Sequence, residues 1–302
     1  MQPWTVAAMR TLIMIGLTAV YAVCFVLIKA GSRFAPALVV AGMRTTIAGA
    51  ALLLLVVALR QPLLPPRRLW GWILALALTS TTGAYGAMFV SPGRAGTGIA
   101  SVLGNLQPVF VIALAALALR ERITWLSWLT LTLGGAGALL IAVPTFAGGD
   151  AYGFTGPALA LASSLGFAAG SVLVKRLNVH SGLLALTGWQ LLIGGLPLLA
   201  ASAIFERETP IVWSARFLAV LLFLTLVGTS LATATWYWLV RREELDRLTV
   251  FLYLVPVFSL AVSLAIYGER IGQTAGVGIA LILTGVVVAI VETWRIGSIH
   301  HS

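Results

Sequence analysis

The sequence predicts an all-α membrane protein with ten transmembrane helices, arranged as two inverted repeats of five helices. The chain is 60% hydrophobic and only 9% charged, a composition far outside the range of soluble proteins. Apolar runs of roughly 20 residues, the length that spans a bilayer core, follow one another along the whole chain. One motif also occurs twice, as NLQPVFVIALAALALRERI at 105–123 and as YLVPVFSLAVSLAIYGERI at 253–271.

The predicted helices share a length close to the thickness of a bilayer and are joined by short loops. In chain order they are Thr11–Ile28, Ala37–Leu59, Leu69–Val90, Thr97–Leu119, Thr124–Val143, Gly156–Val174, Leu183–Phe205, Phe217–Val240, Leu248–Tyr267 and Gln273–Val291. The first run follows Arg10 as a signal peptide would. It is long for that role and no clear small-residue cleavage site follows it, so we interpret it as the first membrane helix.

The repeated motif sets an offset of 148 residues between the two halves, from Asn105 to Tyr253. We predict one repeat at residues 1–145 and a second at residues 156–295. Because each repeat contains five helices, the second must enter the membrane in the opposite direction to the first. This arrangement is typical of secondary transporters, whose substrate site lies near the midplane between the repeats.

The distribution of Lys and Arg predicts that both termini face the cytoplasm. With the N-terminus inside, twelve basic residues fall on the cytoplasmic side and six on the outer side. The net charge of +10 is then explained by topology and by contacts with anionic lipid, since the basic residues sit in short loops between apolar runs. We therefore expect membrane lipid, and no nucleic acid, among the partners.

The doubled Pro-x12-Glu-Arg-Ile motif, the glycine-rich helices after each copy and the two five-helix halves resemble the EamA type of the drug/metabolite transporter superfamily. The resemblance covers nearly the whole chain. It implies a basket of ten helices in a bacterial inner membrane, with a central cavity that opens alternately to each side. It also implies a carrier that moves a small-molecule substrate, often out of the cell. Amino acids are the expected substrates, and other metabolites or drugs are the alternative.

Two prolines are predicted to bend their helices near the middle of the membrane. Pro108 and Pro256 each remove a backbone hydrogen bond, which leaves the carbonyls of Gly104 and Leu252 without their usual donor. Lipid offers such carbonyls no partner, so we expect the bends to face the protein interior and to act in gating. A purely structural kink is the alternative.

Equivalent positions in the two repeats predict the residues that line the cavity. Polar and aromatic side chains share one face of the related helices. The candidates are Tyr21, Thr81, Tyr85, Met88, Ser101, Asn105, Phe167, Thr229, Thr233, Trp236, Thr249 and Tyr253. Hydroxyl and aromatic groups in membrane helices also serve as contacts between helices or as interface anchors, and that alternative stays open.

Arg44 is predicted to lie inside the second membrane helix, and its counterpart in the second repeat is Gln190. Three roles are open for Arg44: binding a substrate carboxylate, pairing with Glu269, or donating to freed carbonyls. We favour a structural role. Helix-end ion pairs, rather than substrate contacts, are predicted for Glu121, Arg122, Glu269 and Arg270.

The sequence contains few features of metalloproteins, enzymes or channels. The chain has one cysteine, Cys24, and three histidines, so we expect no metal site and no cofactor. Without a nucleotide-binding loop or a catalytic base at depth, an enzyme is not expected. A channel is the remaining alternative. It would need a ring of charge or of carbonyls along a continuous pore, and the paired polar faces and kinks favour a carrier instead.

All nine carboxylates lie in loops or at helix ends, so proton antiport through a central acid is not expected either. Glycines in the fifth and tenth helices predict close helix packing or a dimer contact, which leaves open whether the protein is a monomer or a homodimer.

Overall fold

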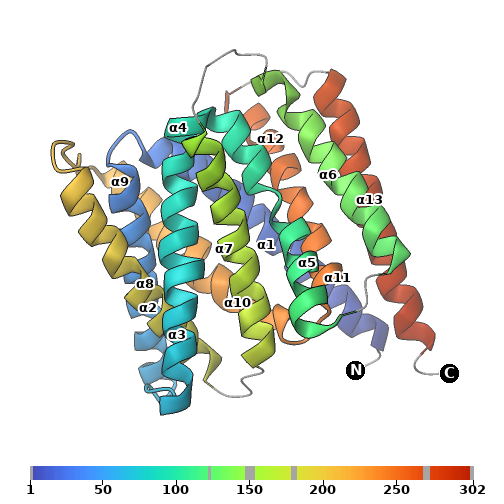
Figure 1. The fold of residues 1–302 in the computed structure, drawn as a ribbon, viewed down its shortest axis with the longest axis horizontal. Helices are drawn as coiled ribbons and strands as arrows, with labels where there is room; N and C mark the ends of the chain where they lie inside the picture. The colour runs from blue at the N-terminus through green and yellow to red at the C-terminus, as the bar shows by residue number, and fades with distance from the viewer. Residues whose placement is uncertain (1–2, 122–123, 147–153, 178–181, 268–272, 300–302) are drawn as a thin grey trace.

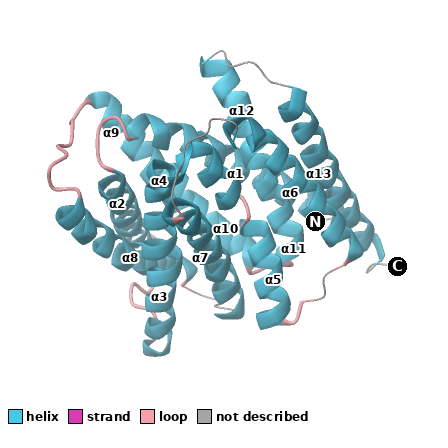
Figure 2. Ribbon diagram, turned by 45° about the horizontal axis from the view of Figure 1, so that its top comes forward, coloured by secondary structure: helices cyan, strands magenta, loops and turns pink. Residues whose placement is uncertain are grey.

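The computed structural model describes residues 3–121, 124–146, 154–177, 182–267 and 273–299, and every regular element in these ranges is helical (Figures 1 and 2). The first half contains α1 (Pro3–Gly31), α2 (Ala37–Ala58), a 3₁₀ turn (Arg67–Leu69), α3 (Trp70–Leu76), η2 (Ala77–Gly83), α4 (Ala84–Gly104), α5 (Gln107–Leu119) and α6 (Trp125–Phe146). The second half contains α7 (Thr155–Leu177), α8 (Leu183–Phe205), α9 (Ala215–Leu222), η3 (Phe223–Leu231), α10 (Ala232–Val240), α11 (Leu245–Thr249), η4 (Val250–Tyr253), α12 (Leu254–Tyr267) and α13 (Gln273–Ile299).

Within the described residues, six helical stretches are long and apolar enough to cross a membrane. They are Ala8–Ile28, Ala37–Ala58, Arg67–Pro92, Thr155–Leu177, Leu183–Phe205 and Ala215–Val240. Four shorter apolar helices cover Gln107–Leu119, Trp125–Leu140, Arg247–Ser259 and Gly276–Val288, and each overlaps one of the other four predicted spans. That all ten cross the membrane stays a prediction.

The outer surface of the bundle is strongly apolar. Large hydrophobic side chains such as Leu54 (70% exposed) and Leu117 (81% exposed) point away from the helices packed around them. A contiguous exposed apolar surface is unfavourable in water and favourable against lipid. The exposure pattern therefore agrees with a membrane protein.

The structure differs from the sequence prediction between the third and fourth predicted helices. A loop was expected between Val90 and Thr97, but helical backbone continues through this stretch as α4, with Pro92 inside it. In Figure 1 the chain changes direction at the top of the molecule within α4 and then descends towards α5. A proline inside a helix is accommodated by a bend, so no separate loop is needed.

Contacts between the two halves are reciprocal. α2 packs along α8, and α6 packs along α13. α7 packs against α5, and α1 packs in the corresponding way against α12. Figure 1 shows α6 and α13 side by side at one edge of the bundle, with α2 and α8 at the other.

The α2–α8 contact is reciprocal at the level of single residues. A Cβ added at Gly49 would meet the backbone nitrogen of Leu192, and a Cβ added at Gly195 would meet Thr46. Gly195 and Leu192 follow Gly49 and Thr46 by the same 146 residues. Such pairing of i with j and of j with i is the pattern of an interface around a twofold axis.

Two π-helical segments among the described residues occupy equivalent places, η2 in the first half and η3 in the second. In η3 the Thr229 hydroxyl donates to the Leu224 carbonyl at 2.7 Å, and the Ser230 hydroxyl donates to the Thr225 carbonyl at 3.1 Å. Each hydroxyl thus bonds the carbonyl five residues before it. Segments of this kind recur at functional sites because they locally loosen the helix.

Gly49→Ala is expected to destabilise the protein by about 1–3 kcal/mol, because the added methyl group overpacks the contact between α2 and α8. Thermal unfolding of the purified protein in detergent measures this effect. Gly16→Ala is the matched control, since a Cβ at Gly16 meets nothing within 4 Å and alanine is favoured in a helix. Equal melting temperatures for the two variants would contradict the close approach of these helices.

Candidate functional site

A cavity of about 820 Å³ lies between the two halves of the bundle. Its described wall residues come from α1, α2, η2, α4 and α5 of the first half, from α7, α8, η3, α10, η4 and α12 of the second, and from the loops between them. The wall is mainly apolar and aromatic, with a few polar groups. Clefts of this size and composition are typical of sites for small molecules.

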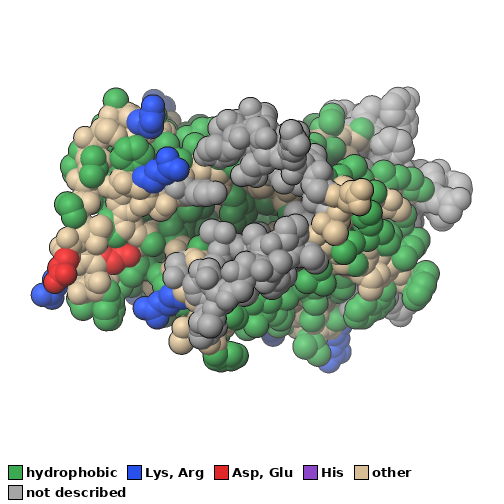
Figure 3. All heavy atoms as spheres, turned by 90° about the horizontal axis from the view of Figure 1, so that it is seen from above, with side chains coloured by type: hydrophobic (Ala, Val, Ile, Leu, Met, Phe, Trp, Pro, Cys, Tyr) green, Lys and Arg blue, Asp and Glu red, His purple; other side chains and the backbone are tan. Residues whose placement is uncertain are grey.

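One end of the cavity reaches the loops at the top of the molecule as drawn in Figure 1. Its wall there includes residues 32–36 of the α1–α2 loop, and Thr209 and Pro210 of the α8–α9 loop. Seen from this end, the surface has a recess near its centre, and the basic side chains nearest to it lie on its left side (Figure 3). The backbone nitrogen of Val212 donates to the Phe34 carbonyl at 2.7 Å, which ties the two loops together.

Several residues predicted from the sequence lie in the cavity wall. They are Tyr21, Tyr85, Met88, Asn105, Phe167, Thr233 and Trp236, together with Arg44 and Pro108. The rings of Tyr85 and Phe167, from opposite halves, meet edge to face with centroids 5.1 Å apart. The Trp236 indole donates to the Ser171 hydroxyl at 2.9 Å. Their contact with substrate stays a prediction.

Other predicted lining residues lie behind this wall. Thr81, Thr229 and Thr249 are completely buried and hydrogen-bonded within the protein, while Tyr253 is 1% exposed and packs against Gly134. Uniform α-helical spacing places these four residues on the cavity face. Thr81, Thr229 and Tyr253 lie in η2, η3 and η4, which depart from that spacing, whereas Thr249 lies in the α-helix α11.

The remaining predicted site residues have other placements. Pro256 is half-buried at the start of α12, outside the described cavity wall. The side chain of Ser101 and residues Arg122, Glu269 and Arg270 lie outside the described residues.

Arg44 joins α2 to the π-helical segment of the opposite half. It is 3% exposed; its Nε donates to the Thr229 hydroxyl at 2.8 Å and its Nη2 donates to the Gly228 carbonyl at 3.2 Å. The guanidinium carbon lies 5.2 Å from the ring centroid of Tyr85 and 5.7 Å from that of Phe89. Of the three predicted roles, donation to a backbone carbonyl is therefore observed.

Gln190 makes the equivalent connection from α8 to the first half. Its Nε2 donates to the Thr81 hydroxyl at 3.1 Å and to the Tyr237 hydroxyl at 3.0 Å. Thr81 and Thr229 are 148 residues apart, as the repeat requires. We call this pair of connections, Arg44 to Thr229 and Gln190 to Thr81, the polar clasp. Sequence reasoning aligned Arg44 with Gln190 but did not find their partners.

The break at Pro108 has a hydrogen-bond partner on a neighbouring helix. α4 ends at Gly104 and α5 begins at Gln107, so the predicted single kinked helix is two helices. The Ser164 hydroxyl of α7 lies 2.7 Å from the carbonyl oxygens of both Leu103 and Gly104. The carbonyl predicted to lose its donor is thus satisfied by a side chain that the sequence argument did not single out.

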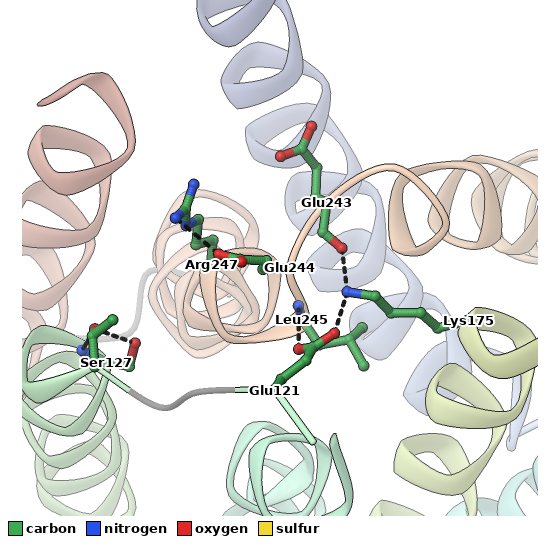
Figure 4. Close-up of polar contacts among 8 residues, drawn as sticks. Glu121, Ser127, Lys175, Glu243, Glu244, Leu245 and Arg247 are labelled. Carbon is green, nitrogen blue, oxygen red and sulfur yellow. Dashed lines mark hydrogen bonds and ion pairs between the residues drawn. The ribbon is translucent and has the colours of Figure 1, made fainter. Parts of the chain in front are cut away.

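The opposite end of the bundle carries a network of ion pairs (Figure 4). Lys175 at the end of α7 pairs with Glu121 and donates to the Glu243 carbonyl at 2.6 Å. Glu121 also accepts from the backbone nitrogen of Leu245 at 3.3 Å, and Arg10 pairs with Glu243. Glu121 is therefore in an ion pair, as predicted for a helix end, but its partner lies in the other half of the chain.

Comparisons with known proteins agree with this architecture. A family model described as the EamA-like transporter family matches the chain twice, at residues 8–143 and 154–291. An uncharacterized transporter of Synechocystis sp. is 30% identical over 264 residues, which cover 82% of this chain and 79% of that protein. A probable amino-acid metabolite efflux pump of Salmonella typhimurium is 28% identical over 276 residues, covering 88% and 89%. A crystal structure with 20% identity has a TM-score of 0.80 and covers 95% of this chain and 99% of its own, which indicates a shared fold.

Ser164→Ala is expected to lower the free energy of unfolding by about 1–3 kcal/mol, because the Gly104 carbonyl at the α4–α5 break loses its hydroxyl donor, while the Leu103 carbonyl keeps the Leu106 backbone nitrogen. Thermal unfolding in detergent measures the loss. Thr132→Ala serves as the control, since the Thr132 hydroxyl donates only to Trp128 and Leu129 of its own helix among the contacts found. If both variants melt at the wild-type temperature, Ser164 does not support the break.

Proposed function

Because the chain belongs to the EamA-like transporter family, we propose that it is a secondary transporter that exports small metabolites by alternating access through the central cavity. The observation that carries this proposal is a cavity that reaches the surface at one end while ion pairs join the two halves at the other. Amino acids are the proposed substrates, since the name of one relative that matches most of the chain refers to amino-acid metabolites.

We propose that ten helices cross a bacterial inner membrane as two inverted repeats, residues 1–145 and 156–295, with both termini in the cytoplasm. Arg10 near the start of α1 pairs with Glu243, and Lys175 at the end of α7 donates to it. The first helices of the two repeats therefore run in opposite directions, as inversion requires. The two ends of the described chain lie on the same side of the bundle (Figure 1), which supports an even number of crossings.

Alternation between two open states requires one end to close as the other opens. The Glu121–Lys175 ion pair joins the repeats at the closed end. The equivalent positions in the other repeat hold Glu269 and Lys29, whose side chains lie outside the described residues. We propose that these two close the opposite end in the alternate state. The break at Pro108 and the π-helical segments are the proposed flexible points.

The charged residues found in the described cavity wall are Arg33 and Arg44. A carrier that exchanges substrate for protons usually places a titratable carboxylate or histidine at the shared site. We therefore propose exchange or facilitated diffusion rather than antiport with protons through a central acid.

Counterflow in proteoliposomes tests the proposed function. Vesicles loaded with an unlabelled amino acid should accumulate the same labelled amino acid faster than empty vesicles, because a carrier returns faster with substrate bound. A panel of amino acids, other metabolites and cationic drugs identifies the substrate class. Flux that is unaffected by internal substrate would indicate a channel, and chemical change of the label would indicate an enzyme. Accelerated exchange of drugs alone would favour a multidrug carrier.

Lys175→Met and Lys29→Met are expected to shift the equilibrium between the two open states in opposite directions, by about 5- to 100-fold each. Each variant removes the cation of one proposed closing pair. Labelling of Cys24 by a membrane-impermeant thiol reagent, added from one side of oriented vesicles and then from the other, measures the shift. Arg176→Met is the control, since Arg176 has the same charge, is exposed and neighbours Lys175. Parallel changes in both Lys variants would contradict the assignment.

A further inference from the structure

Arg44 has one donor atom that is not used by the fold. Its Nε and Nη2 are hydrogen-bonded in the polar clasp, but its Nη1 is buried and has no partner among the described residues. Arg44 also lines the cavity. From this we propose that Nη1 binds the carboxylate of the transported molecule, an assignment that rests on the proposed transport function.

A cation at this position requires an anion. A charged donor buried without a partner is costly, and an arginine inside a membrane protein is ordinarily paired. None of the ion pairs found among the described residues includes Arg44. A substrate carboxylate that enters the cavity supplies the missing charge and accepts a charge-assisted hydrogen bond from Nη1.

The guanidinium is held in place before the substrate arrives. The hydrogen bonds to Thr229 and Gly228 fix one edge, and the rings of Tyr85 and Phe89 lie close to the guanidinium carbon. Little side-chain freedom is then lost on binding, which favours affinity. The structural role of Arg44 and the proposed binding role use different nitrogens, so they do not compete.

The surrounding wall defines the rest of the ligand. Phe167 and Trp236 line the same cavity as Tyr85 and Phe89. An apolar or aromatic body therefore fits beside the carboxylate, while a cationic drug would meet the unbalanced charge of Arg44. The structure thus points to small organic carboxylates with an apolar body, a class that includes apolar amino acids.

The single cysteine of the chain reports on the charge at this site. Cys24 lines the cavity, and its sulfur and Arg44 Nη2 both lie within 3.7 Å of the point where a Cβ on Gly228 would stand. Rates of Cys24 modification by an anionic and a cationic methanethiosulfonate, each divided by its rate with free cysteine, should favour the anionic reagent. Arg44→Gln should reduce this preference by about tenfold. Arg33→Gln removes the same charge from the cavity rim and should reduce it much less.

Protection of Cys24 from a neutral thiol reagent measures ligand binding. The probes share a phenyl body: L-phenylalanine carries a carboxylate and an ammonium group, 3-phenylpropanoate only the carboxylate, and L-phenylalaninamide only the ammonium group. The two carboxylates should protect wild-type protein better than the amide. In Arg44→Gln they should need about 10- to 100-fold higher concentrations, with the amide unchanged. Arg33→Gln should keep the wild-type order of the probes.

Arg44→Gln is expected to fold, since glutamine occupies the equivalent position 190 and bonds there to the equivalent Thr81. Arg44→Lys keeps the positive charge but replaces the planar guanidinium with an ammonium group. It should therefore weaken protection by the carboxylates less than Arg44→Gln does. Equal protection by amide and carboxylates, absence of protection by either carboxylate, or unchanged carboxylate protection in folded Arg44→Gln would overturn the proposal. If the carboxylates protect Cys24 but no counterflow is observed, the proposed transport function is rejected and the proposed binding site is retained.

Discussion

Backbone groups inside a membrane protein have no water to bond with, and this constraint governs every irregular part of the bundle. The cavity needs helices that bend and break, yet each bend frees a carbonyl. The Ser164 hydroxyl donates at the α4–α5 break, where the Leu103 and Gly104 carbonyls share its one hydrogen, and Arg44 donates to the Gly228 carbonyl in η3. In both cases the donor comes from a neighbouring helix, so an irregular segment is stable only while the helices around it stay packed.

In the polar clasp, equivalent positions of the two repeats carry a charged side chain in one repeat and a neutral one in the other. Arg44 and Gln190 stand at equivalent positions and bond equivalent threonines, so both repeats use the same connection from the second helix to the π-helical segment. Next to Gln190 lies the Tyr237 hydroxyl, which it bonds, whereas the equivalent Phe89 offers Arg44 only a ring face. The duplicated frame is thus nearly symmetric, while the charge in the cavity sits on one side.

The sequence predicted the family, the helical class and several residues that the structure places in the cavity wall, because composition, the doubled motif and shared helix faces depend on local spacing. The family resemblance is confirmed by the matching family model. Local spacing fails where the helix changes type: Thr81 and Thr229 turn away from the cavity because η2 and η3 are π-helical. Partners distant in sequence, such as Ser164 for Gly104 and Lys175 for Glu121, depend on packing that no local pattern encodes.

The relation between the repeats also distinguishes contacts that can persist in both open states from contacts that must break as the cavity opens to each side in turn. The glycine contacts of α2 with α8 are reciprocal, so they look the same from either repeat and can persist in both states. The Glu121–Lys175 pair joins the repeats at one end, and an exchange of roles between the repeats must break it. The close, reciprocal packing of α2 against α8 can therefore stay in place in both states, while the part-buried ion pair at the closed end forms and breaks. Since part-buried pairs contribute only a few kcal/mol, substrate binding energy of similar size is enough to exchange one closed end for the other.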